Sequence, residues 1–222
     1  MVDGIIICLC SYKENLDHYI RLQQAEMPMV FYDRIPYGMN VSQVIVDDYI
    51  KAFFLVEHLI REGYRHIVHL QGPDDVYNSV ERARGYKDAL AKFNIPFNKD
   101  RMLKAGLTFK DGANAADMLI EKGISFDAIF AFTDTLAIGA MNRLRDLGKK
   151  IPEEIAIASF SGTVLSTIVY PQLTTVEPPL QQMGKVVAEL IIEKIKEPLS
   201  PNRSIVLDAE IKLRASSKKE KK

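Results

Sequence analysis

The sequence has few cysteines and few histidines, which limits the kinds of site it can build. Its 222 residues include two cysteines, Cys8 and Cys10, in one apolar segment. Residues two positions apart make a poor disulfide, so both are expected to be reduced core residues of a cytosolic protein. No third cysteine or nearby histidine completes a metal site with them. The four histidines also lack partners at metal-ligand spacing, so no bound metal is expected.

The sequence motifs of several enzyme classes are also missing. There is no P-loop, no G-x-G-x-x-G and no H-E-x-x-H, and Ser161-Gly162 lacks the G-x-S-x-G of a nucleophile elbow. An α/β enzyme reading therefore lacks a nucleophile, a base and a cofactor site, so neither catalysis nor a cofactor is expected. No signal peptide and no apolar run of transmembrane length occurs, which favours a cytoplasmic protein with no membrane partner.

An excess of positive charge is absent as well. Lys and Arg total 29 and Asp and Glu total 29, so the body of the chain is not built to bind a phosphate backbone. The last five residues, KKEKK, are mostly lysine. Such an end is usually frayed and solvated, so residues 217–222 are expected to form a disordered basic tail.

The chain does contain a regular alternation of strand and helix patterns. In residues 126–160, an apolar run ends at Thr133-Asp134, a helix-period run ends at Gly148, and a second apolar run begins at Ile155. This is the pattern of a βαβ unit, and continuous apolar strands favour a parallel sheet covered on both faces. The alternation predicts a doubly wound α/β fold. Strands are expected at 2–9, 29–32, 44–46, 65–70, 102–105, 128–132, 204–207 and 210–213, helices at 14–25, 49–62, 79–93, 111–122, 135–147 and 180–196, and irregular structure at 164–175.

Polar residues that follow strands are the candidate site residues, because open α/β sheets bind small ligands at the carboxyl ends of their strands. Arg82 lies early in a helix after such a strand and can present a planar fork to hydroxyls, carboxylate or phosphate. It can equally pair at the surface with Glu81 or Glu57. Asp33 can accept hydrogen bonds from ligand hydroxyls or serve as a turn residue.

Two further junctions have similar alternatives. Thr133 is available to a ligand, while Asp134 is expected to cap the next helix. Ser159–Gly162 forms a polar loop with room for backbone contacts. Asp47-Asp48 is expected to be a helix N-cap, favoured by the helix dipole.

Three spaced motifs carry a resemblance to a known family. GP…ERARGYKDAL, AFTDTLAIGAMNRLRDLGKKIPEEIAIASF and PQLTTVEPPLQQMGKVVAELI resemble the effector-binding core of the lactose-repressor/galactose-repressor family. The match runs from VDGIIICLC to AEIKLRAS. The resemblance implies a periplasmic-binding-protein-like pair of α/β subdomains with a ligand cleft, in a homodimeric transcriptional regulator.

The resemblance also implies the domain boundaries. Residues 1–64 with 177–202 would form the N-terminal subdomain, and 65–176 with 203–216 the C-terminal one. The family's helix-turn-helix, hinge helix and first strand–helix–strand–helix block have no counterpart before Val2. The first subdomain is therefore expected to be truncated, with DNA binding only through the missing region.

The same resemblance assigns ligand contacts residue by residue. Ser161 stands where many members carry an aspartate, and a neutral hydroxyl is the weaker acceptor, which argues against an ordinary hexose. The expected ligand-binding residues are Arg82, Asp33, Asn78, Thr133, Ser161, Leu107, Phe109 and Leu180.

A dimer is expected from the same comparison. The helix at 135–147 carries more small and apolar residues than one inner stripe needs, and family members meet there across a two-fold axis. The alternative is that Ile138 and Met141 face the sheet and Tyr170 covers a loop. The expected interface residues are Ile138, Asn142, Val169 and Tyr170.

The function implied is sensing of a sugar, sugar phosphate or nucleoside-like effector. Ligand-driven closure of the subdomains would control DNA binding by the missing helix-turn-helix. The alternative is a stand-alone sugar-binding protein of a transport system, against which the missing signal peptide argues. Replacement of Arg82 by alanine is expected to abolish binding with little loss of stability.

Overall fold

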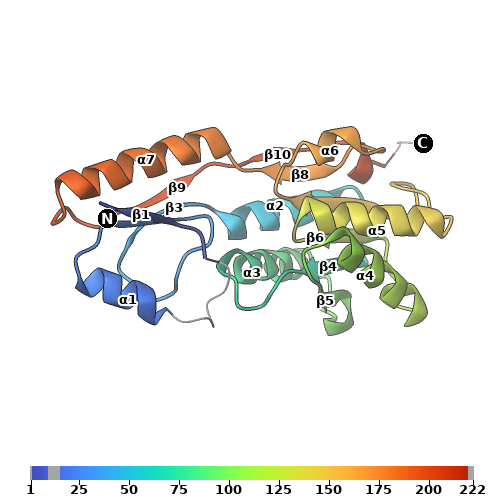
Figure 1. The fold of residues 1–222 in the computed structure, drawn as a ribbon. Coiled ribbons are helices and arrows are strands. Elements are labelled where there is room, and N and C mark those ends of the chain that lie inside the picture. The colour runs from blue at the N-terminus through green and yellow to red at the C-terminus, as the bar shows by residue number, and fades with distance from the viewer. Residues whose placement is uncertain (1, 10–15, 220–222) are drawn as a thin grey trace. The chain divides into compact units, whose positions relative to one another are not determined.

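The chain forms two compact α/β units (Figure 1). The computed structural model describes residues 2–9 and 16–219. Unit 1 comprises Met1–Asp47, Asp75–Asn78 and Pro178–Ala209, and unit 2 comprises Asp48–Asp74, Ser79–Glu177 and Glu210–Lys222.

Unit 1 is built on a sheet with the strand order β1-β2-β3-β9. The strands are β1 (Ile5–Ile7), β2 (Met29–Tyr32), β3 (Ser42–Val46) and β9 (Ser204–Leu207), and all their pairings are parallel. Helix α1 (Asp17–Gln24) lies on one side of the strands and α7 (Leu180–Lys196) on the other (Figure 1). Phe31, in β2, packs against Tyr19 of α1. Both faces are covered, which explains the continuous apolar strands.

Unit 2 contains a larger sheet with the order β10-β8-β7-β6-β4-β5. Its pairings are parallel except the antiparallel β10–β8 pair. The strands are β4 (Ile67–Gln71), β5 (Met102–Lys104), β6 (Ala128–Ala131), β7 (Ala156–Phe160), β8 (Thr174–Glu177) and β10 (Glu210–Lys212). The helices are α2 (Asp48–Arg61), α3 (Tyr77–Lys92), α4 (Phe109–Glu121), α5 (Asp134–Asp146) and the short α6 (Leu165–Ile168), with 3-10 turns η1 (Lys99–Arg101) and η2 (Ala215–Ser217). The first two residues of α3, Tyr77 and Asn78, belong to unit 1.

Two glycines allow α4 and α5 to pack closely. A Cβ atom at Gly139 would lie 2.0 Å from the carbonyl oxygen of Phe109, and one at Gly112 would lie 2.2 Å from that of Leu136. Only glycine leaves room for these backbone contacts. Buried side chains of these two helices and of strands β4, β6 and β7 form one apolar core of unit 2.

The crossings between the units differ from the expected positions. The chain leaves unit 1 before Asp48 rather than near Gly63, and it last leaves that unit after Ala209 rather than near Arg203. Helix α2 contacts strands β7 and β8 of unit 2, and β9 extends the sheet of unit 1 beside β3. The remaining expected crossing, at 176–177, lies next to the observed change from Glu177 to Pro178.

The stretch expected to be irregular, 164–175, contains α6 and the first two residues of β8. Thr174, Thr175 and Val176 of β8 are buried. The threonine hydroxyls are hydrogen-bonded within the protein: the Thr174 Oγ1 lies 2.7 Å from the Ser217 Oγ, and the Thr175 Oγ1 donates to the Asp134 Oδ1. Ser217, placed in the expected disordered tail, is instead buried in η2. Residues 220–222 of that tail, like Cys10, lie outside the described residues. Within the described ranges, no helix has the length and apolarity needed to cross a bilayer.

Candidate functional site

Asp33 and Asn78 come together in unit 1. Asp33 directly follows β2 and has a left-handed backbone (φ 57°), which aspartate tolerates better than most residues. Its side chain is 34% exposed. Its Oδ1 accepts a hydrogen bond from the Asn78 Nδ2 at 3.3 Å, and its Oδ2 lies 3.8 Å from the Arg34 Nε. The carboxylate therefore stands partly open to solvent at the carboxyl end of a strand.

Asn78 is the more buried partner, at 2% exposure. Its Oδ1 has no hydrogen-bond partner among the described residues. A buried polar atom left unpaired costs about 1–3 kcal/mol. A ligand hydroxyl that donates a hydrogen bond to this oxygen would remove that cost.

Arg82 is not a surface residue, and neither expected surface partner holds it. It is 4% exposed, and its Nε donates to the Asp48 Oδ1 at 2.8 Å. Its Nη1 donates to the Phe132 carbonyl at 2.7 Å. The guanidinium carbon lies 3.6 Å from the Phe160 ring centroid.

The carboxylates named as alternatives for Arg82 are used elsewhere. Glu81 pairs with Arg84, and Glu57 pairs with Arg61 and Lys92. Asp48, the first residue of α2, is the buried counter-ion of Arg82. Phe160, the last residue of β7, and Phe132, directly after β6, flank the Arg82 guanidinium. The sequence reasoning missed the Arg82–Asp48 pair, and aromatic residues at two strand ends were the available signal for it.

Thr133, and not Asp134, caps the helix that follows them. Thr133 is the N-cap of α5, where its Oγ1 accepts from the Leu136 amide at 3.3 Å. Asp134 is fully buried and accepts hydrogen bonds from the Ser159 Oγ at 2.6 Å, the Thr175 Oγ1 at 2.7 Å and the Thr163 amide at 2.6 Å. Asp134 thus ties the ends of β7 and β8 together.

The Ser161 loop has an unusual backbone. Ser161 has φ 136° and Gly162 has φ 60°, and a Cβ at Gly162 would lie 2.3 Å from the Glu177 Cγ. The Ser161 amide is bonded to the Val176 carbonyl at 3.1 Å. Arg82, Thr133 and Ser161 follow β4, β6 and β7, which are neighbours in the sheet. They share one edge of unit 2.

The apolar candidates lie on accessible surfaces of their own units. Leu107 is 39% exposed, Phe109 46% and Leu180 66%. Leu180 lines an apolar pocket of about 350 Å³ within unit 1. The pocket is lined by Ile6, Tyr32, Leu180, Met183, Gly184 and Val187.

The expected interface residues differ in their surroundings. Ile138 is 4% exposed in the core beside α4, which favours the alternative that it faces its own unit. Val169 packs against the same core. Asn142 is exposed, and Tyr170 is 80% exposed.

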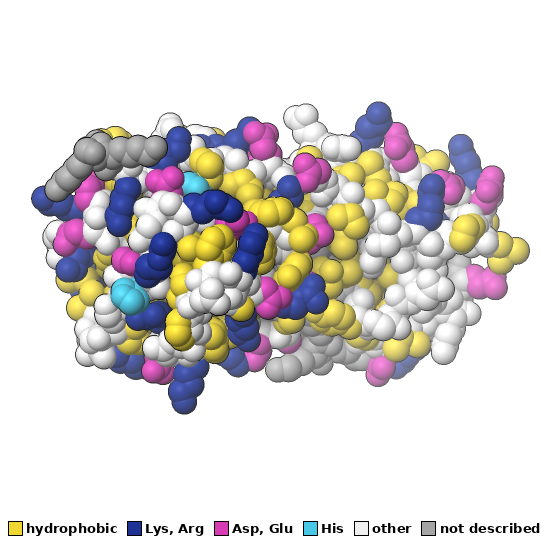
Figure 2. Space-filling model, turned by 180° about the vertical axis from the view of Figure 1, so that it is seen from behind, with side chains coloured by type: hydrophobic (Ala, Val, Ile, Leu, Met, Phe, Trp, Pro, Cys, Tyr) yellow, Lys and Arg dark blue, Asp and Glu magenta, His cyan; other side chains and the backbone are white. Residues whose placement is uncertain are grey.

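Charge and metal-binding groups add little to the site. Among residues 2–9 and 16–219, no group of three His, Cys, Asp or Glu side chains is arranged to hold a metal ion. Figure 2 shows Lys and Arg side chains interspersed with Asp and Glu on the face it presents. This face therefore offers no uniform positive field to a nucleic acid.

Comparisons with known proteins point to one family. The model of the periplasmic binding protein-like domain matches residues 56–217. The HTH-type transcriptional repressor PurR of Aliivibrio fischeri (strain MJ11) is 28% identical over 217 residues, which are 97% of this chain and 64% of that protein. The chain thus spans less than two thirds of this relative.

Solved structures agree with this match. The transcriptional regulator CelR–cellobiose complex superposes with a TM-score of 0.90 at 27% identity, over 97% of this chain and 66% of that one. A LacI family transcriptional regulator from Enterococcus faecium with bound ribose gives a TM-score of 0.88 at 25% identity, over 99% of this chain and 81% of that one.

Proposed function

Because the chain belongs to the periplasmic binding protein-like domain family and resembles LacI-family regulators, we propose that it is the effector-sensing core of a transcriptional regulator. In this proposal the effector is a neutral, hydroxyl-rich small molecule, such as a mono- or disaccharide. Relatives of known structure contain cellobiose or ribose.

The observation that carries the proposal is the pairing of Asp33 with Asn78. A carboxylate accepts several hydrogen bonds from hydroxyls, and the Asn78 Oδ1 is buried without a partner among the described residues. The Asp33 carboxylate and the Asn78 side-chain oxygen are therefore two neighbouring acceptors, which suit a ligand with two neighbouring hydroxyl groups. The further residues proposed to contact an effector are Leu180 of unit 1 and, in unit 2, Arg82, Leu107, Phe109, Thr133 and Ser161.

The charges at these residues favour a neutral ligand. The Arg82 guanidinium is already balanced by Asp48 at 2.8 Å, so it offers no uncompensated positive charge to a phosphate. Asp33 in turn lies 3.8 Å from the Arg34 guanidinium, so neither pair offers a net positive charge to a phosphate. We therefore prefer a sugar to a sugar phosphate as the effector class.

The proposed signal is a shift in population. An effector that binds one conformation better than another shifts the equilibrium by its difference in affinity. In a longer protein that carries a DNA-binding region, the same difference in effector affinity would change the affinity for the operator.

Titration calorimetry of the 222-residue chain with cellobiose and ribose tests the proposal. Asp33→Asn keeps the shape of the side chain and removes its charge, so it should weaken sugar binding roughly tenfold. Asp146→Asn makes the same chemical change at an exposed residue of α5. It is the matched control and should leave sugar binding unchanged. No heat from either sugar, or equal affinity in the Asp33 variant, would contradict the assignment.

A further inference from the structure

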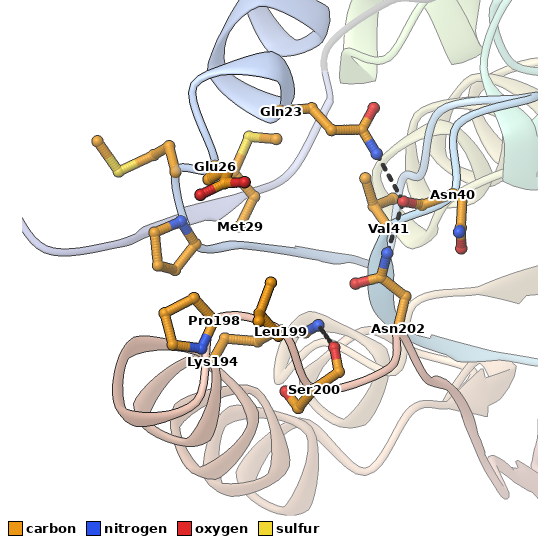
Figure 3. A pocket seen from close by; sticks show the side chains of 12 residues that line it. Gln23, Glu26, Met29, Asn40, Val41, Lys194, Pro198, Leu199, Ser200 and Asn202 are labelled. Carbon is orange, nitrogen blue, oxygen red and sulfur yellow. Dashed lines mark hydrogen bonds between the residues drawn. The ribbon is translucent and has the colours of Figure 1, made fainter.

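A second pocket lies at the opposite end of the unit 1 strands from Asp33. It has a volume of about 290 Å³ and opens beside residues that begin or precede strands, including Met29 of β2, Val41 before β3 and Asn202 before β9. Figure 3 shows it between the end of α1 and the loop that follows α7. Its lining includes Glu26, Met27, Lys194 and Ser200.

Lys194 is the unusual residue of this pocket. It is only 6% exposed, and its Nζ donates to the Ser200 carbonyl oxygen. The adjacent carboxylate, Glu193, is paired with Arg203. No carboxylate pairs with Lys194 among the described residues. Burial lowers the pKa of the Lys194 ammonium. The neighbouring Glu193 carboxylate offsets part of this effect by raising the pKa. A buried charge without a carboxylate in direct contact is unfavourable, and here it borders a pocket that an anion can enter.

The rest of the lining divides into polar and apolar parts. The Ser200 Oγ is buried without a hydrogen-bond partner among the described residues. The side-chain amides of Gln23 and Asn202 both donate to the Asn40 carbonyl at 2.7 Å, so they hold the wall in place. Methionine, proline, valine and leucine side chains supply the apolar surface. Glu26 lies across the pocket from Lys194 (Figure 3).

We propose that this pocket binds a small monocarboxylate with a short apolar body, its carboxylate placed on the Lys194 ammonium and the Ser200 hydroxyl. One buried cation balances one negative charge, and Glu26 disfavours a ligand of higher negative charge such as phosphate. The methionine and proline surfaces receive the apolar body. The carboxylate can belong to a free acid or to an apolar amino acid, whose ammonium would then face Glu26.

Methyl NMR locates the binding directly. With 13C-methyl methionine in the 222-residue chain, 4-methylpentanoate and leucine are titrated separately, with 3-methylbutylamine and phosphate as probes that lack the carboxylate. Either acid should shift the Met27 and Met29 methyl signals and leave Met141, in the core of unit 2, unchanged. The amine and phosphate should shift none of them.

Variants then test the role of the cation. Lys194→Met keeps the chain length and should lower affinity for the acid about tenfold or more, while the exposed Lys196→Met on the same helix should not. Ser200→Ala leaves Lys194 in place and should weaken binding more modestly, which keeps the test valid if Lys194→Met folds poorly. If the ligand is an amino acid, Glu26→Gln should weaken the binding of leucine and leave the binding of 4-methylpentanoate unchanged.

Two results would overturn the proposal. One is that neither acid shifts the Met27 and Met29 signals. The other is that the shifts persist at full affinity in both Lys194→Met and Ser200→Ala. Neither result bears on sugar binding at Asp33, which Asp33→Asn tests separately.

Discussion

The Nε of Arg82 lies 2.8 Å from the Oδ1 of Asp48, and their side chains are 5% and 1% exposed. Breaking a buried ion pair by removing one partner leaves an uncompensated charge, which typically costs about 3–5 kcal/mol. Arg82→Ala should therefore lower the free energy of unfolding by that order. The sequence alone led to the expectation that Arg82→Ala would cause little loss of stability, and the buried ion pair argues against that expectation.

Urea unfolding of two arginine variants checks this prediction. Arg84→Ala removes a guanidinium whose side chain is 57% exposed and paired with Glu81, and exposed pairs contribute at most about 1 kcal/mol. If both variants unfold at the same urea concentration, the Arg82–Asp48 pair does not stabilise the fold.

His69 should make stability depend on pH. It is fully buried, and burial lowers the pKa of its imidazole from 6.5 to about 4, a change opposed in part by the hydrogen bond with the Phe130 carbonyl. The folded state therefore favours neutral His69. As pH falls from 6.5 towards 4, the unfolded chain takes up a proton that the folded chain excludes, so stability decreases by up to roughly 3 kcal/mol.

Unfolding curves between pH 7 and pH 4 measure this loss. His69→Phe retains an aromatic ring that can stack on Phe130, 4.6 Å away between centroids, and should reduce the slope across that window. The exposed His66→Gln should leave the slope as it is. An identical slope in the wild type and His69→Phe would assign the pH dependence to other groups.

Glycine substitutions should have opposite effects in two helices. Gly139→Ala forces a methyl group against the Phe109 carbonyl, where 2.0 Å is available, so it should destabilise by about 1–3 kcal/mol. Gly184→Ala lies in α7 with no atom within 4 Å of the added Cβ, so it should stabilise by roughly 0.5–1 kcal/mol. Thermal melts of the two variants decide the matter, and a shift of the same sign in both would contradict the packing argument.

We predict a dimer through the exposed part of the α6 region. Val164, Ile168 and Tyr170 are 73%, 69% and 80% exposed, and single exposed residues of this size are common whereas a cluster favours an interface. Sedimentation equilibrium should give a dimer for the wild type. Ile168→Asp with Tyr170→Ala should shift it to monomer, because neither side chain supports the core.

A matched control guards against unfolding. Ile192, 50% exposed on α7 of unit 1, can be changed to aspartate without touching this cluster, and that variant should remain dimeric. A monomeric wild type, or a double variant that dimerises as well, would remove the α6 region from the interface. Ile138→Asp is unsuitable here because Ile138 is buried.

Regular elements were predictable where one pattern dominated. The expected bounds of β2, α7 and β9 coincide with those observed, because each is an apolar run of definite period with a breaker nearby. Strand β8 was missed because the sequence TTVE looks like a loop when read alone. Its threonine hydroxyls can be buried only because distant residues bind them: Arg214 and Ser217 bind that of Thr174, and Asp134 binds that of Thr175.

The sequence by itself determined the fold class, the family and the strand ends at which the polar candidates lie. These follow from local periodicity and from motifs that are read in order along the chain. Tertiary structure alone decided which groups neutralise one another. Arg82 meets Asp48 rather than Glu81 or Glu57, and Asp134 rather than Thr133 joins the strand ends. Partners 25 to 41 residues apart have no local signature, because their proximity arises only when neighbouring strands place their ends side by side.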